Sequence, residues 1–336
     1  LERWTGRAQV DFHFKFAQGG PTIDVTVLSN YLWERGGELE WEQTEYFING
    51  NRVRWKQIPQ LPLVQPEKVV TLPLDLTLDR TYAYTLGGEE RVGDRDAYVL
   101  AFEPAEPDTD GPLYRGRVWI DRETFVRLKA SVVQTGGLES PVLSNEEIDR
   151  YAPVEGPDGH EYWMLSEVDG QQVWNAAGRN FVVRRELRFE SFDLNPSIET
   201  FDAARARAYA SDNQMLRDTV DGFRYLRRED DGTRTVETEI KTRQLFALGG
   251  ALQDSSTSGV IPLAGVNWFD YETFGRDIQT NLFFAGPLAF GTLTVPELFD
   301  RKIDVTFDVG LSALKTEDKV FVDGVEATAL RIRDRT

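Results

Sequence analysis

Residues 92–102 read VGDRDAYVLAF and residues 113–128 read LYRGRVWIDRETFVRL, with an acidic loop that holds three prolines between them. Gly93-Asp94 suits a tight turn, and the residues after it alternate along a strand that is apolar on both faces. The second segment has one polar and one apolar face, and residues 121–124 turn the chain back. The sequence therefore predicts three consecutive antiparallel strands here, and nothing in them resembles a reaction centre.

The composition limits the classes of partner and chemistry. A chain of 336 residues with 40% hydrophobic residues is long enough for two folded domains. The net charge of −18 argues against binding to nucleic-acid phosphates and does not favour anionic lipid surfaces. The absence of cysteine excludes disulfides, thiolate metal sites and a cysteine nucleophile. No apolar run is long enough for a transmembrane helix. The chain opens without methionine and ends just after an apolar stretch, so we interpret both ends as cut.

The rest of the first 195 residues also reads as strands. Residues 9–16 alternate strictly between apolar and polar side chains, and Asn49-Gly50 is a strong hairpin signal. Asp158-Gly159 and Asp169-Gly170 predict two further turns. Residues 181–192 alternate as well, but Arg185 intrudes on their apolar face. We expect nine to eleven strongly twisted antiparallel strands and very little helix.

The pattern changes after Asn195-Pro196, which we interpret as a domain boundary. Thr200 is the expected N-cap of a helix that continues through Met215 and Leu216. Asp231-Gly232 begins another β region. Its expected strands are 235–246, 279–284, 288–295 and 303–309, and a turn at Asp323-Gly324 leads into 327–332.

Residues that could carry chemistry have ordinary explanations. His13 and His160 have no partner at metal-ligand spacing, and neither an HExxH nor a GxSxG motif is present. Acidic pairs occur in turn-like polar clusters, which we interpret as solvated: Glu38/Glu40, Glu89/Glu90, Glu146/Glu147 and Asp230/Asp231. We predict no catalytic residue, no metal site and no cofactor.

Aromatic residues on the strand faces offer more apolar surface than one helix can cover. Two sheets could cover each other as a sandwich, or one curved sheet could leave a concave apolar cavity that binds an acyl chain. Both alternatives stay open at this point.

Three segments together resemble a known family. Residues 92–102, residues 114–125 with Trp119-Ile120-Asp121, and residues 184–195 are similar to the LolA/LolB-like outer-membrane lipoprotein-sorting proteins, which include the RseB/MucB sensor domain. The resemblance covers about residues 1–196 and is one of strand pattern. It implies an open antiparallel half-barrel whose concave apolar face holds lipid or lipoprotein acyl chains. Family members have a helix before the first strand, and residues 1–4 would be its last turn.

The C-terminal part has a second resemblance. Residues 245–336 are weakly similar to the strands of surface-antigen-type outer-membrane β-barrels, notably at 263–270 and 274–279. They would be the start of a longer barrel or a small soluble β domain. The expected organisation is a mostly β chain with a LolA-like half-barrel at 1–196, a helical linker at 197–222 and a second antiparallel β region at 223–336.

The resulting functional hypothesis is non-enzymatic binding of lipid or lipoprotein acyl chains in the periplasm or at the outer membrane of a diderm bacterium. It would serve lipoprotein sorting, transport or sensing, with other envelope proteins as further partners. One alternative is a structural or accessory subunit of an envelope complex, and another is a carbohydrate-active β-sandwich hydrolase. The residues expected to line the binding face are Phe12, Phe14, Phe16, Val25, Val27, Leu72, Leu74, Leu100, Val118, Ile120, Trp163 and Phe189.

Overall fold

The computed structural model describes most of the chain, in two compact units. The described residues are 1–16, 22–53, 78–106, 112–138, 142–176, 179–219, 222–237, 243–252, 261–276, 278–299, 301, 303–313, 316–318, 321–327 and 332–334. The first unit comprises Leu1–Asn175 and Arg179–Ile240, and the second comprises Lys241–Thr336 with Ala176–Gly178. Among the described residues, no helix is both long and apolar enough to cross a membrane.

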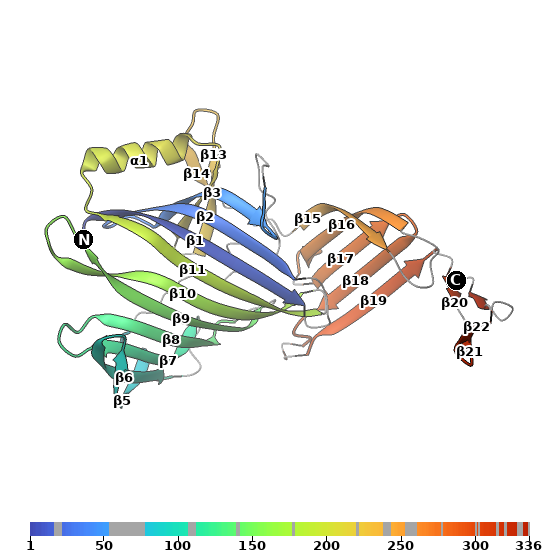
Figure 1. Ribbon diagram of the computed structural model, residues 1–336, viewed down its shortest axis with the longest axis horizontal. Helices are drawn as coiled ribbons and strands as arrows, with labels where there is room; N and C mark the ends of the chain where they lie inside the picture. The colour runs from blue at the N-terminus through green and yellow to red at the C-terminus, as the bar shows by residue number, and fades with distance from the viewer. Residues whose placement is uncertain are drawn as a thin grey trace. The chain divides into compact units, whose positions relative to one another are not determined.

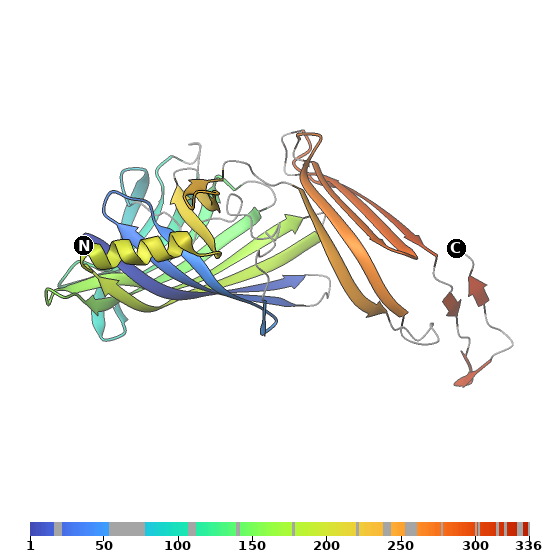
Figure 2. The ribbon, with the colours of Figure 1, turned by 90° about the horizontal axis from the view of Figure 1, so that it is seen from above.

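The first unit is built on one large, twisted antiparallel sheet (Figures 1 and 2). Its strand order is β14-β13-β12-β3-β2-β1-β11-β10-β9-β8-β7-β6-β5, and β4 pairs with β3. The described residues up to 194 form eleven strands, within the expected nine to eleven. Their bounds are β1 (Arg3–Phe16), β2 (Ile23–Glu34), β3 (Glu40–Ile48), β4 (Asn51–Arg52), β5 (Tyr82–Val92), β6 (Arg95–Pro104), β7 (Leu113–Asp121), β8 (Arg127–Gly136), β9 (Val142–Glu155), β10 (Glu161–Ala176) and β11 (Arg179–Leu194).

Turn chemistry sets most of the strand ends. Asn49 and Gly50 both adopt positive φ, as a two-residue hairpin between β3 and β4 requires, and Gly93 does so between β5 and β6. After β7, the Asp121 carboxylate accepts hydrogen bonds from the backbone N–H groups of Glu123 and Thr124, at 3.0 and 2.7 Å, which closes the predicted turn.

The turn predicted at Asp169-Gly170 is wrong. Both residues lie inside β10, and Gly170 faces Glu147 of β9 across the ladder. A Cβ atom on Gly170 would come within 2.9 Å of the Arg185 guanidinium. The glycine therefore makes room for a large side chain rather than for a change of direction.

Helix α1 (Ile198–Ala210) begins and ends differently from the prediction. Its N-cap is Ser197, whose hydroxyl accepts a hydrogen bond from the Thr200 N–H at 3.2 Å. The helix ends at Ala210, so Met215 and Leu216 belong to the next strand, β12 (Gln214–Thr219), which pairs with β3. The sheet continues through β13 (Gly222–Arg228) and β14 (Arg234–Val236). At the other end of this unit, Arg3 and Trp4 lie in β1 and not in a helical turn.

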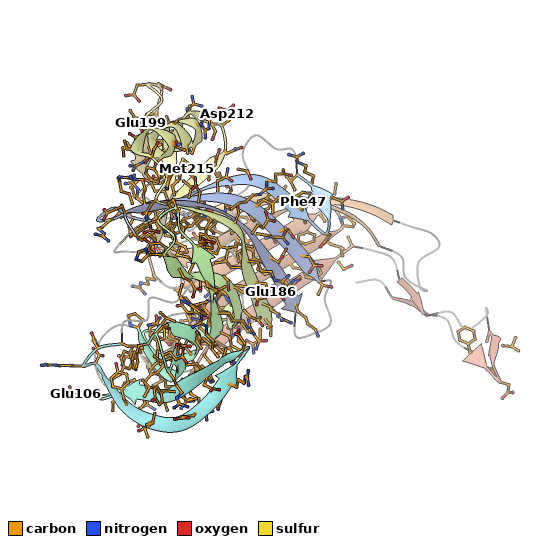
Figure 3. All side chains as sticks on the ribbon, turned by 60° about the vertical axis from the view of Figure 1, so that its left-hand side comes forward. Phe47, Glu106, Glu186, Glu199, Asp212 and Met215 are labelled. Carbon is orange, nitrogen blue, oxygen red and sulfur yellow. The ribbon has the colours of Figure 1, made fainter. Side chains whose placement is uncertain are left out.

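The two faces of this sheet can be assigned from strand register, because directly opposed residues in an antiparallel pair point to the same side. The face that carries Tyr31, Trp41 and Leu216, which are direct partners in turn, is called the inner face. Leu32 and Met215, their chain neighbours, point to the outer face. There they form a core with Phe201 of α1. Met215 accordingly lies beneath the helix (Figure 3).

Helix α1 is fixed to the outer face by a buried carboxylate. Glu40 of β3 accepts hydrogen bonds from the Tyr209 hydroxyl at 2.7 Å and from Arg217 at 2.6 Å, and Arg205 of the helix lies 3.2 Å from it. The helix therefore leaves the inner face uncovered.

The second unit holds a five-stranded antiparallel sheet in the order β15-β16-β17-β18-β19. The bounds are β15 (Arg243–Leu252), β16 (Ile261–Thr273), β17 (Ile278–Ala285), β18 (Leu288–Val295) and β19 (Val305–Ser312). Two small pairs follow, β20 (Thr316–Asp318) with β23 (Ile332–Asp334), and β21 (Phe321–Val322) with β22 (Val325–Glu326). The strands predicted at 279–284 and 288–295 and the turn at Asp323-Gly324 are confirmed. The predicted boundary at residue 196 stays a prediction.

Candidate functional site

The inner face of the large sheet gathers the predicted lining residues. Leu100, Val118, Ala130, Asp149 and Val168 are direct partners in turn from β6 to β10, so their side chains share this face. Val118 and Ala130 are completely buried. The apolar cluster at this end joins residues of β5 to β8: Tyr82, Phe102, Tyr114, Val118, Ala130 and Val132, with Leu100 and Ile120 packed against them.

The other arm of the inner face is formed by β1, β2, β3 and their neighbours. Val10 lies opposite Val27 on one side and Leu187 on the other. Phe12 stacks on Phe14 with ring centroids 6.3 Å apart. The cluster on this arm contains Ala8, Tyr31, Trp41, Val168, Leu187 and Leu216, with Trp4, Val10, Phe189, Phe223 and Tyr225 at its margin.

Most of the predicted lining residues therefore share one face, and their role in binding stays a prediction. The register and clusters place eight of them there: Phe12, Phe14, Val25, Val27, Leu100, Val118, Ile120 and Phe189. The register also places Trp163, the direct partner of Pro153, on the side of Asp149, and its ring packs against the cluster of Ala97, Val99, Trp119 and Leu128 under the Arg95 guanidinium at 4.8 Å. Phe16 ends β1 opposite Phe181. Leu72 and Leu74 lie outside the described residues.

A buried polar band separates the two apolar arms. Arg185 of β11 donates to the Asn145 side-chain oxygen at 3.0 Å and lies 3.6 Å from the Glu147 carboxylate. Asn145 donates in turn to Gln134 of β8 at 3.1 Å. All four side chains are buried, as is Asp149. The interpretation of Glu147 as a solvated residue is therefore wrong, because it belongs to a charged network inside the sheet.

Burial dominates the electrostatics of this polar band. It raises the pKa of the Asp149 carboxyl, against the opposing effects of a hydrogen bond with Glu147 and of the charges on Arg127 and Arg185. It lowers the pKa of the Arg185 guanidinium, against the attraction of the two carboxylates. Two residues signal this band in the sequence, Arg185 on an apolar face and Gly170 beneath it. Its partners on β9, Asn145 and Glu147, are not signalled in this way, because polar side chains occur on both faces of β9 around them.

The other acidic pairs do not converge on a common cleft. Neighbours in a strand point to opposite faces, and Glu89 pairs with Arg122 at 2.8 Å while Glu90 accepts from the Trp119 indole at 2.8 Å. The exposed His13 lies 2.8 Å from Asp24. Within the described part of the chain, no group of three or more His, Cys, Asp or Glu residues could hold a metal ion.

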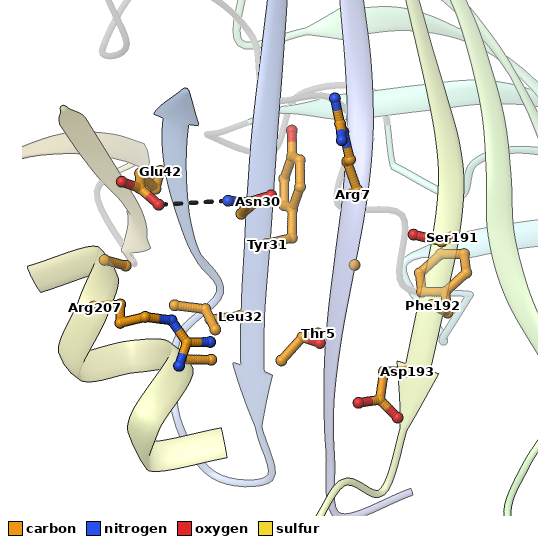
Figure 4. Close-up of a pocket in the computed structure, with 13 residues that line it drawn as sticks. Thr5, Arg7, Asn30, Tyr31, Leu32, Glu42, Ser191, Phe192, Asp193 and Arg207 are labelled. Atoms are coloured by element: carbon orange, nitrogen blue, oxygen red, sulfur yellow. Dashed lines mark hydrogen bonds between the residues drawn. The ribbon is translucent and has the colours of Figure 1, made fainter. Parts of the chain in front are cut away.

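A polar cleft of about 520 Å³ lies on the outer face beside α1 (Figure 4). In its floor Thr5 is opposite Asp193, and Arg7 is opposite Ser191. Arg207 extends from the helix towards these strands (Figure 4). Among the described residues, neither Arg207 nor Asp193 forms an ion pair. The mixed charge of these groups does not suit an acyl chain, so the inner face is the better candidate for an apolar ligand.

Comparisons with known proteins agree with the family resemblance. Residues 39–153 match the sequence model of the MucB/RseB N-terminal domain. The comparison with curated proteins found no match.

Matches to solved structures were also found. One is an outer membrane lipoprotein-sorting protein domain from Vibrio parahaemolyticus, with 11% identity over 61% of this chain and 91% of that chain, at a TM-score of 0.28. A LolA superfamily protein from Nitrosomonas europaea has 12% identity over 58% and 88% of the two chains, at a TM-score of 0.26. The Pseudomonas aeruginosa MucA/MucB complex has 12% identity over 92% and 88%, at a TM-score of 0.19. The match over residues 39–153 confirms the resemblance, and this part of the chain is similar to the N-terminal domain of the MucB/RseB proteins.

Proposed function

We propose that this chain is a non-enzymatic binding protein of the bacterial envelope that holds a lipid or lipoprotein acyl chain on the inner face of its large sheet. The observation that carries the proposal is the gathering of apolar side chains from β1–β3 and β6–β8 on one face, while the only described helix packs on the other. Similarity of residues 39–153 to the MucB/RseB N-terminal domain supports an envelope location.

The polar band determines where on this face an acyl chain would lie. The side chains of Arg185 and Glu147 are already buried and pair with each other, so the band offers no open surface to an acyl chain. The arm of β1 and β2 is the better surface, because Phe12, the direct partner of Arg185 at the edge of the band, is only partly buried. Each buried methylene contributes about 0.8 kcal/mol, and ordering costs oppose this gain.

A second candidate is an accessory subunit that holds another envelope protein. It is favoured by the family match, since one solved complex of a MucB protein contains MucA. In that case the inner face would serve as the core of the domain, and the partner would bind elsewhere.

The test is a titration with a fluorescent long-chain fatty acid. It compares the parent chain with two variants, each substituted at one of two adjacent positions in β1. Phe12→Ser should weaken binding about tenfold, which is the effect of losing about 1.4 kcal/mol of apolar contact. His13→Ser, on the opposite face of the same strand, should leave the Kd unchanged. Equal binding by the two variants, or no binding by the parent chain, would refute the acyl-chain proposal.

A further inference from the structure

One face of the sheet in the second unit carries a run of exposed apolar side chains. Its members are direct partners across the strands: Val266 with Phe284, Leu282 with Gly291 and then Val309, and Ala289 with Leu311. The six exposed side chains on this face are between 45% and 65% accessible: Val266, Leu282, Phe284, Phe307, Val309 and Leu311. Monomeric proteins rarely expose contiguous apolar patches of more than a few hundred Å².

Trp268, Ala289, Gly291 and Leu293 occupy the neighbouring sites of this run. The row of Phe307 and Leu293 continues into Thr280 and then Asp270, which pairs with Arg243 at 3.0 Å at the margin of the apolar run. The opposite face is mixed: the Thr292 hydroxyl donates to Asp308 at 2.7 Å, and Phe283 stacks on Phe290 with ring centroids 6.0 Å apart. The exposed apolar run predicts that its face is covered by another apolar surface.

The charge distribution indicates which surface that is. Residues 241–336 contain 10 Lys and Arg against 13 Asp and Glu, a net charge of −3 out of −18 for the whole chain. Two copies that meet at this sheet would therefore bring together the least charged part of each chain. An anionic membrane would need an excess of basic residues around the patch, which this region lacks.

The area is sufficient for self-association. Two of the six side chains are phenylalanines, each of which buries about 150–250 Å², and the four aliphatic side chains are smaller, so six roughly half-exposed side chains offer about 500 Å² on each copy. Two copies would bury about 1,000 Å² in total, the lower bound for a specific interface. We propose that this face of the β16–β19 sheet is a symmetric contact between two copies of the chain, with the same residues on both sides.

The sheet contains a matched pair of residues for the test. Phe284 and Phe290 have similar accessibilities, 57% and 50%, but lie on opposite faces, since Phe290 is the direct partner of Phe283. Light scattering of the full chain should give a dimer mass that dissociates on dilution. Phe284→Asp should weaken the dimer at least a hundredfold, and Phe290→Asp should leave it intact. A monomer at every concentration, or an equal effect of both variants, would overturn the proposal.

Cross-linking provides a measurement that does not depend on a destabilising substitution. The chain has no cysteine, so a single introduced cysteine supplies the only thiol that can react with a maleimide. Leu282→Cys, near the centre of the apolar face, should give a covalent dimer with a short bis-maleimide. Phe290→Cys on the other face should remain monomeric. Equal cross-linking of the two variants, or none in either, would contradict the symmetric contact.

Discussion

The inner face of the large sheet buries charged side chains, whereas the apolar face of the second sheet exposes apolar ones. On the inner face, the charged side chains of Arg185, Glu147 and Asp149 are buried. On the second sheet, the apolar side chains of Phe284 and Val309 are exposed, and their direct partners on the same face are uncharged. Apolar content alone therefore does not determine which face is covered. Register, sheet curvature and the neighbouring elements determine it.

The largest effect is expected from breaking the buried band. Arg185→Ala would leave the Glu147 carboxylate in the interior without its cation, at a cost of about 3–5 kcal/mol of unfolding free energy. Its neighbour Arg184 is exposed and pairs with Asp169 at 3.3 Å, so Arg184→Ala should cost at most about 1 kcal/mol. Urea unfolding of both variants measures the difference. Similar losses would mean that the band is solvated in solution.

Two valines measure the contrast between the faces directly. Val118 is completely buried, so Val118→Ala should lower the unfolding free energy by about 2 kcal/mol through lost contacts and a residual cavity. Val309 is exposed, so Val309→Ala should change it by less than about 0.5 kcal/mol when measured at concentrations where the chain is monomeric. A large loss at Val309 under those conditions would show that this face is covered within a single chain.

The turn after β7 should make a pH-dependent contribution to the free energy of unfolding. Backbone hydrogen bonds from Thr124 and Glu123 hold the pKa of Asp121 below its usual value. Its contribution is therefore fully present above the unfolded pKa of about 3.9 and is lost as the pH falls through the folded value. Asp121→Asn should cost about 1–2 kcal/mol at neutral pH. Chemical denaturation at several pH values should show this cost disappearing in acid, and a constant cost would contradict the assignment.

Asp149 should show the opposite pH dependence, with the smallest effect. Burial raises its folded pKa, so its unfavourable contribution appears as the pH rises above about 4 and is complete above the folded value. Asp149→Asn should therefore gain stability relative to the parent chain as the pH rises over that window. The same denaturation series measures it, and a relative loss with rising pH would be incompatible with a raised pKa.

Much of this architecture could be predicted from local patterns. Alternation along 9–16 and 181–192 identified strands, and Asn49-Gly50 and Gly93 identified hairpins, because these signals depend on neighbouring residues alone. Asp169-Gly170 misled for the same reason. The local pair is typical of a turn, but the space beneath Gly170 is needed by Arg185 on another strand.

The candidate site could be predicted only in part. The parity of each strand identified Val10, Phe12 and Phe14 as one face. Pairing of β9 with β8 and β10, which places Glu147 and Asp149 among apolar neighbours, is a long-range property that no spacing in the sequence encodes. The register places Trp163 on the same side as Asp149, and its role in binding stays a prediction.

The measurement that tests the central claim most directly is native mass spectrometry of the gently purified chain, followed by organic extraction and lipid analysis. The acyl-chain proposal predicts a stoichiometric adduct that extracts as lipid or acylated peptide and that is reduced in Phe12→Ser but not in His13→Ser. A clean apo mass that persists when phospholipid and lipopeptide are offered would contradict it, and the inner face would then be the core of a protein-binding scaffold.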